Sequence, residues 1–447
     1  MSAQVQQVDK SKFVLVQHDD ILYDESIKTK SISYYKDAWL RFKKNRASVV
    51  AFVILVLLIL MTIIGPMLSS YKLDTVNNKW AQKLKDMPAK IEGLEWIPLF
   101  SGEKELFGYI ENFSSLPDDV LLRIKQRNAD GSMVVVVDYY RYIDHFNSDM
   151  IDPIASTASN KVYLSTSYQT LTIKEYEAVK AYEAETGEQI ILEDGNLLNG
   201  TYRVRVKFYK FLEAIYGVEE PAFWFGSTGG GADLFYTLWK GARLSLLIAF
   251  GVALINIIIG VIIGSISGYY GGTVDLVIER LSELLSGLPF LAIITLLILR
   301  FGSAPWVVVL AFTLTGWLGI SALTRTQFYR YKGREYVLAA RTLGAKDARI
   351  MYRHILPNAV GTLITSLVLY VPSVIFSESS MSYLGIINYP GVTSVGTLLA
   401  NGQAVMKESF YQVVFPALFI SLLMLAFNLF GNGLRDAFNP SLRGVEE

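Results

Sequence analysis

The 447-residue sequence has no cysteine, only three histidines and few charged residues. Charged side chains make up 18% of the chain, whereas soluble domains carry about a quarter. The missing cysteine excludes a disulfide scaffold and a thiol nucleophile. The motifs H-E-x-x-H and G-x-x-x-x-G-K-[ST] are also absent, which excludes a common zinc-protease site and the phosphate-binding loop for ATP. We therefore expect no catalytic residue, metal site or cofactor in this chain, and no nucleic-acid partner.

Hydrophobic residues make up 52% of the chain and gather in long runs without Lys, Arg, Asp or Glu. A transmembrane helix needs roughly 20 apolar residues to cross the hydrocarbon layer of a bilayer. The shortest run has Pro289 near its start, so its helix is the least securely placed. We expect six transmembrane helices, five of them in the runs Ala47–Tyr71, Leu244–Val274, Leu284–Leu299, Phe301–Thr324 and Ser409–Leu434, and one between Arg353 and Glu378.

Basic residues beside the spans indicate which side faces the cytoplasm, because Lys and Arg are enriched there. They precede the first span and dominate the segment between the fourth and fifth spans. Both ends of the chain are therefore expected in the cytoplasm, and residues 72–235 outside it. The domain boundaries that follow are a cytoplasmic segment 1–46, a first helix 47–70, an external domain 71–230, helices two to six within 231–434 with a cytoplasmic loop at 326–357, and a cytoplasmic tail 435–447.

The external segment is long enough to form a domain with its own core. Thr172 and Glu175 form a capping box for a helix that Gly187 would end, and Asp194-Gly195 is a turn signal. Three stretches are typical of strands: Met133–Val137, Gln189–Leu192 and Tyr202–Phe208. We predict an α+β domain inserted into the helical chain. This segment has no catalytic pattern, and residues 71–235 carry a net charge of −8. We interpret it as a domain that either docks a partner protein or shields a transport path from solvent.

The segment between the fourth and fifth spans predicts two short helices separated by a glycine. Glu335 to Leu343 has helical composition, and Gly344 can adopt the left-handed conformation that ends a helix. A second helix from Lys346 leads to Pro357, which suits the first turn of the fifth span. Small side chains at Ala339 and Ala340 would permit close docking of a partner. The alternative is an ordinary interfacial loop with a basic face.

This loop resembles the signature loop of ABC importer permeases. The pattern is Ala-Ala-x-x-x-Gly, nine residues, then His-Ile-Leu-Pro. In that family the first short helix is the coupling helix, which sits in a cleft of the cytoplasmic ATPase. Leu338 stands where the family usually has Glu, a departure that is also usual in its peptide-importer branch. The resemblance assigns ATPase coupling to Leu338, Ala339, Ala340, Arg341, Leu343, Gly344, His354, Ile355, Leu356 and Pro357.

The resemblance extends over the first span and residues 230–445, and it is closest to the C-type permease of oligopeptide importers. Segments that carry it include Leu234–Leu246, Gly268–Gly272 with Asp275, and Gly433–Asp436. It implies a type I ABC importer permease fold, with six helices that take up oligopeptides by alternating access. It also implies four kinds of partner in a bacterial plasma membrane: a second homologous permease, two ATPases that bind ATP and Mg, an extracytoplasmic peptide-binding protein, and the lipid bilayer.

The large external domain is not part of this common pattern, so nothing about its role carries over. It leaves open a different hypothesis, in which the chain is a membrane-anchored receptor or sensor whose external domain binds ligand. The sequence does not identify residues that contact a substrate.

Four further features of the sequence carry structural predictions. Glycines recur every fourth residue at Gly260, Gly264 and Gly268, which predicts a groove for close helix packing. Glu283 and Glu378 are expected in solvent at the membrane edges. We also predict an interhelical hydrogen bond for the polar residue Asn428 and a flexible hinge at the glycine-rich segment 226–231.

Overall fold

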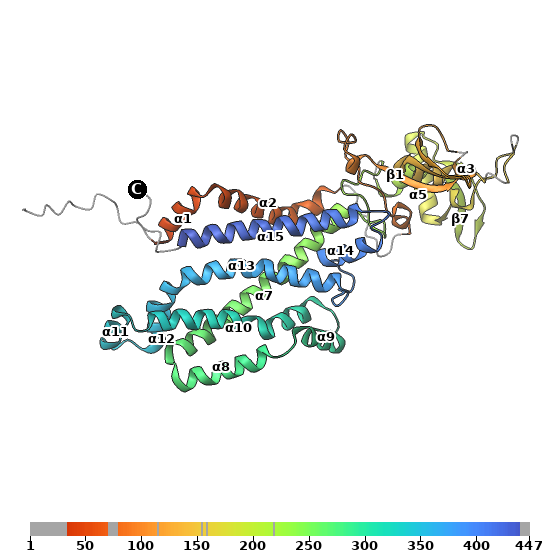
Figure 1. Cartoon of the computed structure of the whole chain (residues 1–447). Helices are drawn as coiled ribbons and strands as arrows, with labels where there is room; N and C mark the ends of the chain where they lie inside the picture. The colour runs from red at the N-terminus through yellow and green to blue at the C-terminus, as the bar shows by residue number, and fades with distance from the viewer. Residues whose placement is uncertain are drawn as a thin grey trace, which may run out of the picture.

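The computed structural model describes residues 34–69, 79–113, 116–152, 155–157, 160–217 and 220–438. The molecule has a half made of long helices and a smaller half that carries the strands (Figure 1). Residues 1–33 and 439–447, which make up much of the predicted N-terminal segment and tail, lie outside the described residues.

Five described helices are long and apolar enough to cross a membrane. They are α2 (Arg46–Leu68), α7 (Leu234–Tyr270), α10 (Pro305–Tyr331), α13 (Leu356–Tyr383) and α15 (Tyr411–Phe438). Figure 1 shows them side by side, with α1 (Tyr34–Lys44) and the end of α15 at the pole opposite the strands. Ala38 and Phe42 of α1 are buried with Ala437 of α15, so the first described helix is fixed to the last one.

A sixth span exists only if two bent helices are counted together. α8 (Gly272–Ser286) and α9 (Phe290–Phe301) meet at an angle of 72°. The run Leu284–Leu299, expected to hold the third span, is thus divided between the end of α8 and the start of α9. Pro289 accounts for the break, since proline has no N–H to donate and forces the preceding residue out of the helical conformation.

The three glycines of α7 face α10 at very short range. A Cβ atom on Gly260 would lie 2.7 Å from Ile320 Cβ, and one on Gly264 would lie 2.3 Å from the Ser321 carbonyl oxygen. One on Gly268 would lie 2.6 Å from the Cβ of Phe328. Even a methyl group would push the two helices apart, so this contact requires glycine.

The strand-bearing half is α+β. One antiparallel sheet has the order β1-β3-β2, formed by β1 (Glu103–Tyr109), β3 (Ser132–Asp138) and β2 (Leu121–Arg127). A second sheet is built on β7 (Thr201–Val206), which pairs with β4 (Tyr168–Thr172), β5 (Ile191–Glu193) and β6 (Leu197–Leu198). Its helices are α3 (Ile110–Phe113), α4 (Tyr139–Ser148), α5 (Ile173–Thr186) and α6 (Phe208–Tyr216).

The local predictions for this half are mostly confirmed. Thr172 and Glu175 form the capping box of α5, and Gly187 ends that helix with φ +73°. The chain does not reverse at Asp194-Gly195. The strands on either side of it, β5 and β6, both pair with β7 along the same edge. The chain reverses instead at Asn199 and Gly200, whose φ angles are +50° and +76°.

The two ends of the inserted segment meet at one place. Ser69, after the last turn of α2, donates a hydrogen bond of 2.5 Å to the carboxylate of Asp233. Asp233 also caps α7 by accepting from the Phe235 amide at 2.9 Å. Because the inserted segment begins and ends at adjacent points, it does not disturb the packing of α2 against α7.

The glycine-rich segment 226–231 is packed, so the prediction of a flexible hinge is wrong. Ser227 is fully buried, and its hydroxyl donates to the Leu84 carbonyl at 2.5 Å. Tyr411 of α15 donates to the Ser227 carbonyl at 3.1 Å. A Cβ on Gly231 would lie 1.6 Å from the Ala81 carbonyl oxygen, so here glycine permits a close approach of two backbones.

Two polar residues of the long helices are not where the sequence suggested. Glu378 is fully buried in α13 rather than solvated, and it accepts from the hydroxyls of Ser245 and Ser382 at 3.0 Å each. Asn428 is exposed on α15 and has no hydrogen-bond partner among the described residues. Glu283 is exposed as expected and pairs with Arg280 at 2.6 Å.

We expect Gly264→Ala to destabilise the helical half by about 1–3 kcal/mol, because the methyl group has no space against α10. Gly251→Ala in the same helix is the matched control, because a Cβ there has no neighbour within 4 Å. Thermal unfolding of the purified chain should give a lower midpoint for Gly264→Ala only. Equal midpoints for the two variants would contradict the packing account.

A second expectation concerns the junction at Asp233. Burial raises the pKa of this carboxyl group from 3.8 to about 6. Since the folded pKa exceeds the unfolded one, ionisation costs folding free energy above about pH 6, and this cost vanishes below about pH 4. Asp233→Asn should therefore stabilise the protein by about 1–3 kcal/mol at pH 7 and by nothing near pH 4. Unfolding midpoints measured against pH, with exposed Asp118→Asn as the control, test this; parallel curves would contradict it.

Candidate functional site

The loop between α10 and α13 forms two short helices at the pole opposite the strands (Figure 1). These are α11 (Glu335–Thr342) and α12 (Asp347–Ile350). Gly344 lies between them with φ +79°, a conformation that strains any residue with a side chain. The predicted order of helix, glycine and helix is confirmed.

The second short helix runs into α13 without a break. One π-helical turn, Met351–Ile355, joins α12 to Leu356, the first residue of α13, and Pro357 lies in its first turn. The carbonyl of His354 in the π turn accepts from the Asn358 side chain at 2.8 Å. The chain is therefore helical without interruption from Asp347 to Tyr383.

A small apolar cluster packs the loop against the ends of α7 and α10. Val337 of α11 is fully buried against residues that come from α7, α10, α12 and the π turn. Because the cluster draws on every element around the loop, the loop and the helix ends form one packed unit. Its buried members are Tyr269, Phe328, Val337, Ile350 and Ile355.

Polar contacts also hold the loop against the ends of α7 and α10. The Tyr269 hydroxyl donates to the Asp347 carboxylate at 2.6 Å, and Arg341 donates to the Tyr269 oxygen at 3.1 Å. This hydrogen bond raises the pKa of the Arg341 guanidinium above its usual value. Lys332 donates to the carbonyl of Gly268 at 2.9 Å. Tyr269, near the C-terminal end of α7, thus contacts both α11 and α12.

The loop exposes apolar side chains among its charged ones. Leu343 is 88% exposed and Leu338 is 46% exposed, and Ala339 also faces outward. Ala340 is buried at 8% exposure, so the two alanines do not share a docking face as the sequence suggested. A bulky residue at Ala340 would disturb the packing of the loop itself, whereas Leu343 and Leu338 are free to contact a partner.

A partly buried ion pair near the loop was missed by the sequence reasoning. Arg325 of α10 donates two hydrogen bonds to Asp275 of α8, at 2.5 and 2.6 Å. Tyr329 donates to the same carboxylate at 2.8 Å, and Ser267 of α7 also donates to it. The only signal in the sequence was an acid near one end of an apolar run and a base near the end of another, and their pairing depends on the fold.

Two family models match most of the helical part of the chain. Residues 260–444 match the binding-protein-dependent transport system inner membrane component. Residues 33–86 match the N-terminal TM domain of oligopeptide transport permease C. Residues 87–259, which include most of the strand-bearing half, lie outside both matches.

Curated relatives share about half of the chain. The dipeptide transport system permease protein DppC of Bacillus subtilis is 42% identical over 221 residues, which cover 49% of this chain and 69% of that protein. The chain belongs to the permease family of binding-protein-dependent ABC importers. The oligopeptide transport system permease proteins OppC of Bacillus subtilis and Escherichia coli are 40% and 38% identical, over 49% and 50% of this chain and 72% and 74% of theirs.

Membership of this permease family fixes the coarse properties of the chain. It is a transport component of a membrane rather than an enzyme, with a type I importer permease fold and five or six candidate spans. No cluster of metal-binding side chains occurs among the described residues.

Removing the guanidinium partner of Asp275 should destabilise this permease. Arg325→Ala would leave the carboxylate, which is 7% exposed, without its main partner. Because Arg325 itself is partly exposed, we expect a loss of about 2–3 kcal/mol. The control is Arg349→Ala, on the exposed surface of α12. A drop in the thermal midpoint for Arg325→Ala alone is the expected result, and equal midpoints would show that the pair contributes nothing.

Proposed function

We propose that this permease is one of two membrane subunits that form a peptide path in an ATP-driven importer. Separate ATPases bind ATP and Mg and contact the loop at 326–357, and an extracytoplasmic binding protein delivers oligopeptides to the other end. Support comes from family membership, from relatives named as dipeptide and oligopeptide permeases, and from the two exposed leucines of the loop.

The loop geometry is the observation that best supports coupling. Leu338 and Leu343 are exposed on a loop that packs, through the cluster around Val337, against the ends of α7, α10 and α13. Closure of the ATPases would push on α11 and α12, and the continuous helix from Asp347 to Tyr383 would carry that motion across the membrane. Alternating access then follows from rigid movement of packed helices.

The orientation that fits this function places the loop and both chain ends in the cytoplasm of a bacterial cell. The strand-bearing insertion, residues 72–235, would then lie outside the plasma membrane, where it either docks the binding protein or walls the path. Family membership favours transport over the receptor hypothesis, for which ligand binding by the insertion would be the main activity.

Purification of the native complex tests the proposed function. We expect this chain to bring down a second permease and two ATPases, and proteoliposomes of that complex to take up labelled oligopeptide only with ATP and loaded binding protein. Uptake without ATP, or a complex without ATPases that binds ligand through the insertion, would contradict the proposal and favour a receptor.

Leu343→Asp is the sharpest single change at the loop. A carboxylate in place of an 88% exposed leucine would have to be desolvated on docking. We expect uptake to fall by about tenfold or more, which corresponds to about 1.4 kcal/mol, and less ATPase to copurify. Leu198→Asp, at a 68% exposed leucine of β6, is the matched control and should keep its ATPase subunits. Normal uptake by Leu343→Asp would contradict the role of the loop.

A further inference from the structure

One side of α13 carries a row of small polar side chains, with the exposed Phe376 among them. Its polar side chains recur at spacings of four and seven residues, which places them on one side of a helix. All of them are exposed or half-exposed in the structure, and none is charged. They are Asn358, Thr362, Ser366, Ser373 and Ser380.

The neighbouring helix α15 also exposes polar side chains. Ser421, Asn428 and Asn432 are exposed at spacings of seven and four residues, with the exposed Leu425 beside them. The two helices are in close contact, since a Cβ on Gly431 would lie 2.7 Å from the Leu369 side chain. A groove of about 400 Å³ includes Ser380 and Ser421, but most of the residues that line it are apolar, such as Phe376 and Ile420.

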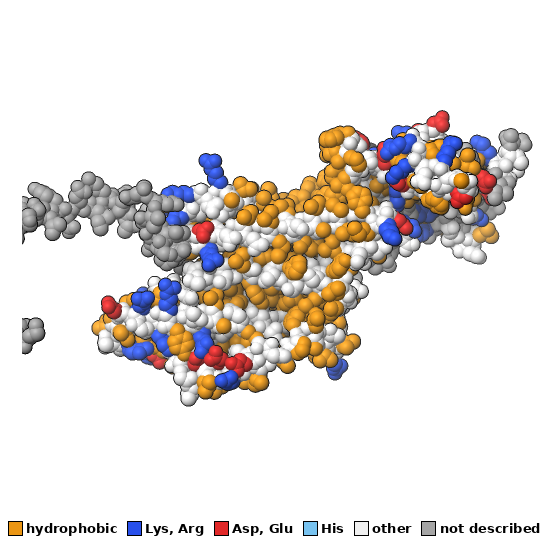
Figure 2. Space-filling model, viewed as in Figure 1, with side chains coloured by type: hydrophobic (Ala, Val, Ile, Leu, Met, Phe, Trp, Pro, Cys, Tyr) orange, Lys and Arg blue, Asp and Glu red, His pale blue; other side chains and the backbone are white. Residues whose placement is uncertain are grey.

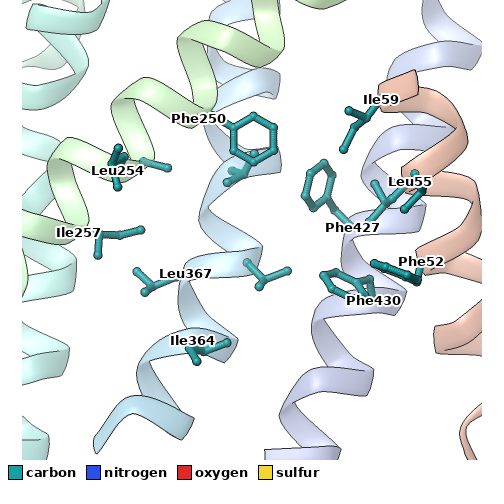
Figure 3. Close-up of a pocket in the computed structure, with 14 residues that line it drawn as sticks. Phe52, Leu55, Ile59, Phe250, Leu254, Ile257, Ile364, Leu367, Phe427 and Phe430 are labelled. Atoms are coloured by element: carbon teal, nitrogen blue, oxygen red, sulfur yellow. The ribbon is translucent and has the colours of Figure 1, made fainter. Parts of the chain in front are cut away.

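Other exposed surfaces of the helical half are different. The exposed side chains of α2 after Arg46 and of α7 after Arg243 are apolar, as expected for helices that face lipid. The far side of α13 also lines an apolar pocket of about 390 Å³, between Phe250, Leu254 and Phe427 (Figure 3). In Figure 2 the charged side chains of the helical half gather toward its ends. The uncharged polar side chains of α13 and α15 lie on helices that are long and apolar enough to cross a membrane.

Hydrocarbon cannot satisfy the amides on this face. A hydroxyl can bond to its own helix, as Ser373 does by donating to the Tyr370 carbonyl at 2.6 Å. Asn428 and Asn432 have no such partner among the described residues. An amide without hydrogen bonds in an apolar medium costs several kcal/mol. The face must therefore meet water or another polar group.

We propose that the polar face of α13 and α15 lines the water-filled path of this permease and contacts the main chain of the passing peptide. This inference rests on the proposed function. Amides and hydroxyls can pair with the N–H and C=O groups that every peptide residue carries. A lining without charge neither traps nor repels charged side chains, which suits substrates of varied sequence.

Single-cysteine labelling tests this inference, and the natural chain has no cysteine to remove. Asn428→Cys and Ser373→Cys would be compared with Leu254→Cys and Ile258→Cys, which are 60% and 50% exposed on α7. The probe is a charged, water-soluble methanethiosulfonate, applied to the complex with its second permease and ATPases in proteoliposomes. Only a thiol in contact with water ionises and reacts quickly with it.

We expect the two path positions to react at least tenfold faster than the α7 controls, and saturating peptide-loaded binding protein with ATP to slow them. Rates as slow as the controls in every nucleotide state would overturn the proposal. Fast reaction only in the absence of the second permease would also overturn it, because the face would then be a subunit interface. Uptake by the unmodified complex is measured in parallel, so fast labelling without peptide uptake would contradict the proposed function alone.

Discussion

The constraint on which the rest of this structure depends is that hydrocarbon offers no hydrogen bonds. A polar group at membrane depth is stabilised by a partner inside the protein or by water. The carboxylate of the buried Glu378 accepts from two serine hydroxyls, and the amide nitrogen of the fully buried Asn256 donates to the Tyr370 hydroxyl at 2.8 Å. Asn428 meets neither condition within this chain, which is why its face is informative about the substrate path.

The close packing of α7 on α10 also determines where the loop lies. Glycines let the two backbones approach, and the last turns of the same helices carry Tyr269 and Phe328, which pack against α11 and α12. The loop is therefore positioned by its packing on the membrane helices. A force applied at Leu343 would act on three long helices at once, as a coupling element requires.

The sequence predicted the apolar helices, the helix–glycine–helix loop and the capping box at Thr172, because each depends on residues close together in the chain. It did not predict the bend at Pro289 as a break, nor the pairing of Asp275 with Arg325, which lie 50 residues apart. Solvent exposure was the other weak point. Glu378 and Ala340 are buried and Asn428 is exposed, since burial depends on which helices meet.

The central claim is that the outward face of the loop contacts an ATPase, and cross-linking from that face tests it most directly. A photo-reactive amino acid in place of Leu343 would be irradiated in native membranes, and the adducts identified by mass spectrometry. The account predicts a dominant adduct with an ABC ATPase subunit, and much less from the same group at Leu198. Adducts with lipid only, or with proteins that are not ATPases, would contradict it.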